Sequence, residues 1–236
     1  MAKMVGYACN IKLQWLNMAV QLLKENYTEA EYKDSMNHYL SFEIDSPTRL
    51  RKTREILMNI WYYDAEPEIE KLRKEAMALL EKYPEQDAAI HLCMIYLFYP
   101  VVADICKYIG KITEFQDEVT NAALKQKLYD EWGERGSLET TCRRVTLTLK
   151  DMGILEAPTK TRYVVSRRTI TNTKLINFML VVAMKLDGSS YYSFTEMSDF
   201  PMLFPYELHV SKEALLEDGR FAMSNFGGEL SYSLND

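Results

Sequence analysis

The sequence predicts a mainly α-helical fold with a small β component. Apolar residues recur with helical spacing through the first 110 residues. Stretches rich in β-branched and aromatic residues stand in the second half, around residues 161–169 and 207–210, and favour short strands. The 236 residues include only 9 Gly and 7 Pro, so little of the chain is expected to be a disordered linker.

Four amphipathic helices are expected in the first third of the chain. Residues 11–24 carry apolar side chains at helical spacing, and residues 27–40 continue as a more polar helix with aromatic side chains. The third helix begins at Ser46 and Pro47, because serine caps helices and proline is favoured at the first helical position. The fourth helix has an apolar stripe over residues 69–80 and is expected to end before Pro84.

The stretch from residue 86 to residue 110 is the most apolar part of the chain. It is apolar on nearly every face except at Pro100 and Asp104. Proline removes a backbone donor and disrupts a helix interior. We therefore expect a central buried helix that is broken or kinked at Pro100, followed by a connector over residues 110–120.

Two helices joined by a glycine-rich turn are expected next. The first covers residues 122–132 and ends at the turn from Gly133 to Gly136. Ser137 is expected to cap the second helix, and Gly153 is placed to end it in a left-handed conformation. The residues that share the inner face of this second helix are Leu138, Cys142, Val145, Leu149 and Met152.

The remaining segments are expected to alternate short strands with helices. Residues 161–169 favour a strand or hairpin flanked by positive charge, and residues 175–186 favour a buried helix, with a strand as the alternative. The last expected elements are a strand at residues 207–210, a capped helix at residues 211–217, and a turn at Gly227-Gly228 before a final strand.

Charge is distributed unevenly along the chain. The formal net charge is −6, but residues 124–174 contain 11 Lys or Arg and 6 Asp or Glu, so this window carries +5 and the remainder carries −11. Local patches decide which partners a surface attracts. Because the composition changes here, we predict a helical N-terminal subdomain over residues 1–117 and a C-terminal subdomain over residues 118–236.

The order of elements after residue 118 resembles a winged helix-turn-helix domain: a helix, a short glycine turn, a capped helix ending in Met152-Gly153-Ile154-Leu155, and a basic β segment. The resemblance covers about residues 118–170. It implies that the helix from Ser137 to Met152 is a recognition helix, that residues 160–168 are the wing, and that duplex DNA is the partner. The residues expected to contact DNA are Thr140, Arg143, Arg144, Leu147, Lys150, Lys160, Arg162, Arg167 and Arg168.

The resemblance assigns these residues different contacts. Arg143 and Arg144 would reach guanine edges or phosphates, and Leu147 would contact a thymine methyl. In the alternative, the winged helix packs against protein, Leu147 contacts another subdomain and the arginines are solvated. The acidic N-terminal helices would then bind a basic partner in an adaptor or scaffold. The apolar Leu147 favours protein contact and the arginines favour nucleic acid, so both hypotheses stay open.

A helical N-terminal half followed by a winged-helix region is also similar to the BrxA-type accessory proteins of bacterial phage-defence (BREX) islands. No residue motif carries this second resemblance, so it implies no residue role. The sequence thus predicts a non-enzymatic DNA-binding protein, either a transcriptional regulator or an accessory factor of a phage-defence or mobile-element system. A homodimer is one expected assembly, because helix-turn-helix readers commonly bind paired half-sites.

No enzyme motif is found in the sequence, and we expect no catalytic residue, cofactor or metal. The three histidines, His38, His91 and His209, lie far apart, and the phosphate-cradling loops GxxxxGK[ST] and GxGxxG are absent. His91 is expected to be a hydrogen-bonded core residue. The four cysteines are widely spaced, which favours reduced, buried thiols.

Two further expectations concern location and a second basic cluster. The longest apolar run, residues 90–103, is too short to cross a bilayer, and no signal peptide is recognised, so a cytoplasmic protein without membrane contact is expected. The second basic cluster lies on the first turns of the third helix and comprises Arg49, Arg51, Lys52 and Arg54. Positive charge is unfavourable at the start of a helix. We therefore expect the cluster either to contact phosphate or to pair with acidic neighbours.

Overall fold

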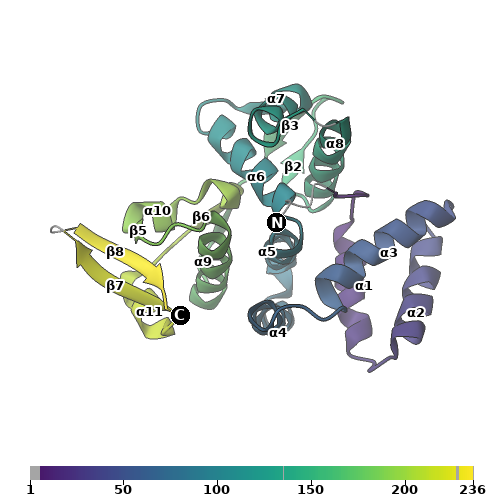
Figure 1. The fold of residues 1–236 in the computed structure, drawn as a ribbon, viewed down its shortest axis with the longest axis horizontal. Helices are drawn as coiled ribbons and strands as arrows, with labels where there is room; N and C mark the ends of the chain where they lie inside the picture. Colours follow the sequence, from purple (N-terminus) through teal and green to yellow (C-terminus); the bar gives the residue numbers. More distant parts are fainter. Residues whose placement is uncertain (1–5, 135, 227–228, 236) are drawn as a thin grey trace.

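A computed structural model describes residues 6–134, 136–226 and 229–235. Within these residues the chain forms eleven α-helices, two short 3-10 helices and eight strands (Figure 1). The strands are two to six residues long and belong to three small sheets. The predicted fold class, mainly α with a small β component, is therefore confirmed.

The first four helices occur where the apolar stripes predict them. They are α1 (Leu13–Leu23), α2 (Glu29–Ser41), α3 (Pro47–Trp61) and α4 (Pro67–Lys82). The hydroxyl of Ser46 accepts the backbone N–H of Arg49 at 3.4 Å and Pro47 is the first helical residue, which confirms the predicted start of α3. Thr28 and Glu31 form a complete capping box at the start of α2.

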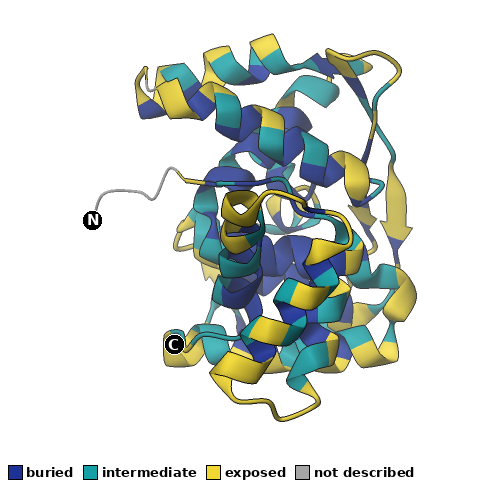
Figure 2. Ribbon diagram, turned by 90° about the vertical axis from the view of Figure 1, so that its right-hand side faces the viewer, coloured by how far each residue is buried: buried dark blue, intermediate teal, exposed yellow. Residues whose placement is uncertain are grey.

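The predicted break at Pro100 is present and separates two helices at the centre of the molecule. A short 3-10 turn, η1 (Pro84–Gln86), leads into α5 (Asp87–Phe98), and α6 (Pro100–Thr113) follows after Tyr99. The side chains of α5 are buried on nearly all sides from residue 88 to residue 96 (Figure 2). A long helix from the second half, α9 (Thr173–Asp187), packs against α5, so residues 175–186 are helical as predicted and not a strand.

A compact unit of two helices and three short strands follows α6. Its elements are β1 (Glu118–Thr120), α7 (Asn121–Trp132), α8 (Gly136–Asp151), β2 (Leu155–Glu156) and β3 (Arg162–Val165). The strands form one antiparallel sheet in the order β1-β3-β2. The connector expected over residues 110–120 is wrong at both ends, because α6 continues to Thr113 and β1 begins at Glu118. With only three residues, β1 is too short to show a period of two in the sequence.

The start of α8 also differs from the prediction by two residues, because a cap at Ser137 would make Leu138 the first helical residue. The helix begins at Gly136, so Ser137 lies inside the first turn and does not precede it as a cap. A glycine-rich turn offers several positions at which a helix can begin, and the sequence pattern alone places such a boundary only to within a few residues.

The last part of the chain adds two small sheets. Strand β4 (Arg168–Ile170) pairs in parallel with β6 (Tyr206–Leu208), and the third sheet has the order β5-β8-β7. Its strands are β5 (Tyr192–Ser193), β7 (Phe221–Phe226) and β8 (Glu229–Leu234). The predicted turn at Gly227-Gly228 lies outside the described residues. Two short helices, α10 (Phe194–Ser198) and α11 (Lys212–Asp218), complete this part, and Ser211 caps α11 as predicted.

Backbone contact joins α6 to the last part of the chain. The 3-10 turn η2 (Pro201–Leu203) lies on α6 at Gly110, where a Cβ atom would stand 2.1 Å from the carbonyl oxygen of Pro201. Buried apolar residues on both sides of residues 117 and 118 belong to one hydrophobic cluster. The division into two subdomains at this point stays a prediction. Within the described residues, no helix has the length and apolar character needed to cross a membrane.

Candidate nucleic-acid interface

The end of α8 is held by a glycine in the left-handed region, as predicted. Gly153 has φ of +67° and donates its backbone N–H to the carbonyl of Lys150 at 3.0 Å. The backbone N–H of Ile154 donates to the carbonyl of Leu149 at 2.9 Å. This pair of bonds is a Schellman motif, which satisfies the last carbonyls of the helix and turns the chain directly into β2.

The inner face of α8 is buried against the rest of the unit. The residues predicted for this face, Leu138, Cys142, Val145, Leu149 and Met152, are all buried. Burial raises the pKa of the Cys142 thiol to about 12, so this thiol stays protonated and unreactive at neutral pH. Thr146 is also buried, and its hydroxyl donates to the side-chain carbonyl of Asn121 at 3.2 Å. The inner face therefore holds α8 against the rest of the unit and does not form a binding surface.

Four residues of the opposite face form a stripe, which we call the outer stripe: Thr140, Arg143, Leu147 and Lys150. Their spacing of three, four and three residues keeps them on one side of a helix. Arg143 and Lys150 are exposed, whereas Thr140 and Leu147 are partly exposed. Neither Arg143 nor Lys150 forms an ion pair with any residue that the structure describes. The outer stripe thus presents two exposed cations that form no ion pair with a described residue.

One flank of α8 is covered by residues 7–13, which we call the N-terminal strap. The hydroxyl of Thr148 accepts the backbone N–H of Ile11 at 2.9 Å, and a carboxylate oxygen of Asp151 accepts the backbone N–H of Leu13 at 2.9 Å. The guanidinium of Arg144 donates to the carbonyl of Tyr7 at 3.3 Å. Arg144, which the sequence assigns to DNA, therefore contacts the strap and lies beside the outer stripe.

The loop between β2 and β3, residues 157–161, stands next to the other end of the outer stripe. Lys160 in this loop is exposed and forms no ion pair within the described part of the chain. Arg162, the first residue of β3, pairs with Glu118 of β1 at 3.2 Å. Another cation, Lys125 of α7, pairs with Glu139 of α8 at 2.8 Å. Lys160 is thus the cation of the loop that remains available to an anion.

Arg167 and Arg168 do not belong to this loop, which corrects the predicted wing of residues 160–168. The chain leaves β3 after Val165 and enters a different sheet, where β4 pairs with β6 and the backbone N–H of Arg168 donates to the carbonyl of Pro205 at 2.8 Å. The guanidinium of Arg168 donates to the carbonyl of Gly153 at 3.0 Å. A strand-like composition cannot show which of two sheets a segment joins.

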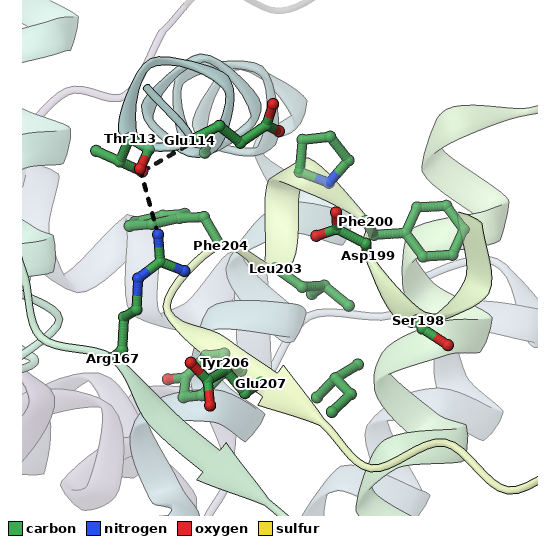
Figure 3. A pocket seen from close by; sticks show the side chains of 13 residues that line it. Thr113, Glu114, Arg167, Ser198, Asp199, Phe200, Leu203, Phe204, Tyr206 and Glu207 are labelled. Atoms are coloured by element: carbon green, nitrogen blue, oxygen red, sulfur yellow. Dashed lines mark hydrogen bonds between the residues drawn. The ribbon is translucent and has the colours of Figure 1, made fainter. Parts of the chain in front are cut away.

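Arg167 lies in a separate pocket of about 200 Å³ between α6, η2 and β6 (Figure 3). Its guanidinium donates to the carbonyl of Thr113 at 3.3 Å. The carboxylates of Glu114, Asp199 and Glu207 line the same pocket. Three acidic residues against one arginine make this pocket unfavourable for a phosphate group.

Ion pairing explains only part of the second basic cluster, at the start of α3. Arg54 pairs with Glu55 at 2.6 Å and donates to Asn37 at 3.0 Å. The other three cations, Arg49, Arg51 and Lys52, are exposed and form no ion pair with a described residue. Pairing with acidic neighbours therefore accounts for Arg54 alone.

His91 and the four cysteines lie in the core, whereas His38 and His209 are exposed. His91 is fully buried, as predicted, and its ring nitrogen Nε2 lies 2.7 Å from the side-chain oxygen of Asn17. Desolvation lowers the pKa of His91 to about 3. All four cysteines are free and buried, as predicted. Within the described ranges, no three His, Cys, Asp or Glu side chains gather as metal ligands would.

Sequence reasoning missed two parts of this surface. The N-terminal strap has neither helical nor strand periodicity, and its partners lie more than 130 residues away. The loop at residues 157–161 was not recognised as a connection between two strands, because β2 has only two residues and no strand was predicted before Pro158. Comparisons with protein-family models, curated proteins and solved structures gave no match.

Proposed function

We propose that the chain is a non-enzymatic DNA-binding protein that contacts duplex DNA through the outer stripe of α8 and the loop at residues 157–161. The observation that carries the proposal is the set of three exposed cations on this one surface, Arg143, Lys150 and Lys160, none of which forms an ion pair with a described carboxylate. Unpaired cations beside an exposed helix are what a protein uses to hold the phosphates on either side of a groove.

The order of elements supports the winged-helix interpretation, which the sequence resemblance places at about residues 118–170. Two helices joined by a short turn are followed by two antiparallel strands, and the loop between these strands stands beside the second helix (Figure 1). In a helix-turn-helix protein the second helix enters the major groove. Under this proposal α8 is that helix, Arg143 contacts a guanine edge or a phosphate, and Arg144 holds the strap instead of DNA.

The biological setting that we propose is transcriptional regulation or an accessory role in a phage-defence or mobile-element system in the cytoplasm. A homodimer would suit such a reader, because two copies of α8 could bind paired half-sites. The competing function is an adaptor, in which the same surface contacts protein.

Binding of a fluorescein-labelled 24-bp duplex, measured by anisotropy from 50 to 200 mM salt, tests the proposal. Each neutralised phosphate contributes about −0.9 to the slope of log affinity against log salt, so three cations predict a slope of about −2.7. In the double variant Arg143→Gln/Lys150→Gln, the slope should fall to about −0.9 and the affinity at 50 mM salt should fall with it.

The matched control removes the same charge from a distant surface. Lys71 and Lys74 are exposed on α4, and Lys71→Gln/Lys74→Gln should leave affinity and slope unchanged. Wild-type protein that fails to bind at 50 mM salt would favour the adaptor. Equal losses in both double variants would show that binding depends on net charge and not on the outer stripe.

A further inference from the structure

Strand β7 is a free edge of the third sheet. That sheet has the order β5-β8-β7, so β7 pairs with β8 on one side and has no neighbouring strand on the other side among the described residues. Figure 1 shows the hairpin of β7 and β8 extending away from the helices at one end of the molecule, with α11 beside the start of β7. The unpaired side of an edge strand presents a row of backbone donors and acceptors that another strand can bind.

The hydrogen-bond pattern shows which backbone groups face the free side of β7. The backbone N–H of Asn235 donates to the carbonyl of Arg220 at 2.7 Å. These two residues continue the register of β7 and β8 by one pair, and hydrogen-bonded pairs alternate with non-bonded pairs along an antiparallel ladder. Ala222 and Ser224 are therefore bonded to β8, whereas the backbone N–H and C=O of Met223 point to the free side.

Strand β7 lacks the features that protect the other edge strands in the described part of the chain. Those strands, β1, β2, β4, β5 and β6, are only two or three residues long. All of them except β5 also contain a charged residue, which disfavours pairing with another chain. These residues are Glu118, Glu156, Arg168 and Glu207. In contrast, β7 has six residues, Phe221–Phe226, with no charge and no proline, and its register with β8 runs without a bulge.

Exposed apolar side chains lie beside this free edge. Met223 is 44% exposed, and Leu230 of β8 is 41% exposed. Met223 is opposite Tyr232, and Leu230 precedes Tyr232 by two residues, so all three side chains point to the same face of the sheet. Tyr232 is fully buried, and its ring packs against that of Phe194. The projecting half of the hairpin therefore carries an apolar surface that the described residues do not cover.

A second copy of the chain suits this edge better than a charged partner. The cation that precedes β7, Arg220, pairs with Glu75 at 2.8 Å and with Asp218. Because the strand itself is uncharged, it offers nothing that would select an acidic or a basic partner. The net charge of −6 opposes self-association, but two β7 strands bring no like charges together. Antiparallel strands also match each other under a two-fold axis, which is the commonest symmetry of homodimers.

We propose that β7 is the interface of a homodimer, in which the β7 strands of two copies pair antiparallel about a two-fold axis at Met223. The two three-stranded sheets then form one sheet of six strands. The backbone N–H and C=O of each Met223 bond to the other copy, and the Met223 and Leu230 side chains of both copies form one apolar surface. This inference does not depend on DNA binding, and it gives a surface to the homodimer that would suit a helix-turn-helix reader.

Sedimentation velocity of the protein without DNA, from about 5 to about 200 μM, tests the dimer. A pairing of two short strands is at the small end of specific interfaces, so we expect a dissociation constant on the order of 10 μM. The average mass should therefore rise with concentration from that of one chain towards that of two. A wild-type protein that stays monomeric at the highest concentration overturns the inference and leaves the proposed DNA binding intact.

Two substitutions at Met223 test the interface. Met223→Pro removes the outward N–H and places the proline ring where the other strand would bind, while the bonds to β8 come from residues 222 and 224. Met223→Lys places two like charges opposite each other at the two-fold axis. Each should raise the dissociation constant at least about tenfold. Phe42→Lys is the matched control, because Phe42 is an exposed apolar residue at the end of α2, and it should leave dimerisation unchanged.

Cross-linking locates the two-fold axis independently of affinity. All four cysteines of the chain are buried, so Met223→Cys introduces an exposed thiol that a short bis-maleimide can reach. Cross-linked dimers should form with Met223→Cys and not with the control Phe42→Cys. The interface is wrong if Met223→Pro and Met223→Lys dimerise like the wild-type protein, or if Met223→Cys gives no more cross-linked dimer than Phe42→Cys.

Discussion

At the scale of single residues, His91 shows how burial determines the protonation of a side chain. The side-chain amide of Asn17 donates to Asp87 at 2.7 Å, so the oxygen of Asn17 is the acceptor for Nε2 of His91. Nε2 therefore carries the proton. The other ring nitrogen, Nδ1, is buried and has no hydrogen-bond partner among the described residues. A proton added to Nδ1 would place an unpaired charge in the core, which is why the pKa falls to about 3.

This lowered pKa predicts a loss of stability in mild acid. The unfolded chain takes up a proton on His91 as the pH falls through about 6.5, whereas the folded chain does so only near 3. The unfolded state binds more protons over this range, so the free energy of unfolding falls as the pH falls. Between pH 7.5 and 5.5 the contribution of His91 is about 1.4 kcal/mol, measurable by urea unfolding.

The variant His91→Gln isolates this effect. Glutamine can still donate to Asn17 but does not titrate, so the stability of the variant should depend less on pH in this window. His38→Gln is the matched control, because it removes an exposed histidine and leaves the core unchanged. The explanation would be wrong if the wild-type protein and His91→Gln lost the same stability between pH 7.5 and 5.5, or if the imidazole resonance of His91 titrated near pH 6.5.

At the scale of elements, the start of α3 is an incomplete version of a motif that the chain uses elsewhere. Capping boxes with glutamate at the third helical position begin α2 and α10, at Thr28 with Glu31 and at Ser193 with Glu196. In α3 the cap is Ser46 but the third helical position is Arg49. A cation there cannot accept the backbone N–H of the cap, and it opposes the helix dipole.

Arg49→Glu should therefore stabilise the protein. The glutamate would complete the capping box and place a negative charge at the positive end of α3, a gain of roughly 1 kcal/mol. For a chain of this size the expected rise in Tm is about 2–4 °C, measured by thermal circular dichroism. Arg49→Gln can complete the box without the charge and should give a smaller rise. A Tm that is unchanged in both variants would contradict the argument.

Elements with strong local signals were predictable, and elements defined by distant partners were not. The start of α3 and the break at Pro100 follow from serine and proline chemistry that acts within a few residues. Strand β4 and the N-terminal strap depend on partners that are far along the chain, Tyr206 for Arg168 and Thr148 for Ile11. For that reason Arg144, Arg167 and Arg168 were assigned to DNA although each has another contact in the fold.

The cationic surface itself was partly predictable. The helical period places Arg143 and Leu147 on the outside of α8, and the charge of residues 124–174 indicates a basic region. Which cations lack carboxylate partners depends on tertiary contacts, such as the pairing of Arg162 with Glu118 across two strands. The pocket lined by Leu147, Pro158 and Tyr163 likewise requires the loop at residues 157–161 to fold back against α8.

At the scale of the whole molecule, the two predicted subdomains share one hydrophobic core. Helix α9 packs against α5 and α4, and η2 contacts α6 at Gly110 through the backbone. We therefore expect a single cooperative unfolding transition. Circular dichroism at 222 nm and tryptophan fluorescence should report the same urea midpoint, because Trp15, Trp61 and Trp132 are buried in different parts of this core.

A comparison of single-tryptophan variants sharpens this measurement. A protein that retains only Trp61 reports on the N-terminal half, and one that retains only Trp132 reports on the unit that contains α8. Coincident midpoints are expected for both. Two midpoints that differ, with the far-UV signal following each in turn, would instead support independent subdomains divided at residues 117 and 118.

The N-terminal strap has a consequence for how the protein is made. Tyr7 and its hydroxyl partner Thr148 are 141 residues apart, so the strap is synthesised long before the helix that receives it. During synthesis residues 7–13 cannot reach their final hydrogen-bond partners until α8 has left the ribosome. Until then the N-terminal strap has no partner on α8, whether or not helix α1 has already formed. The attachment of the strap to Thr148, Arg144 and Asp151 therefore belongs to the late steps of folding, and the flank of α8 is closed only when the two halves have met.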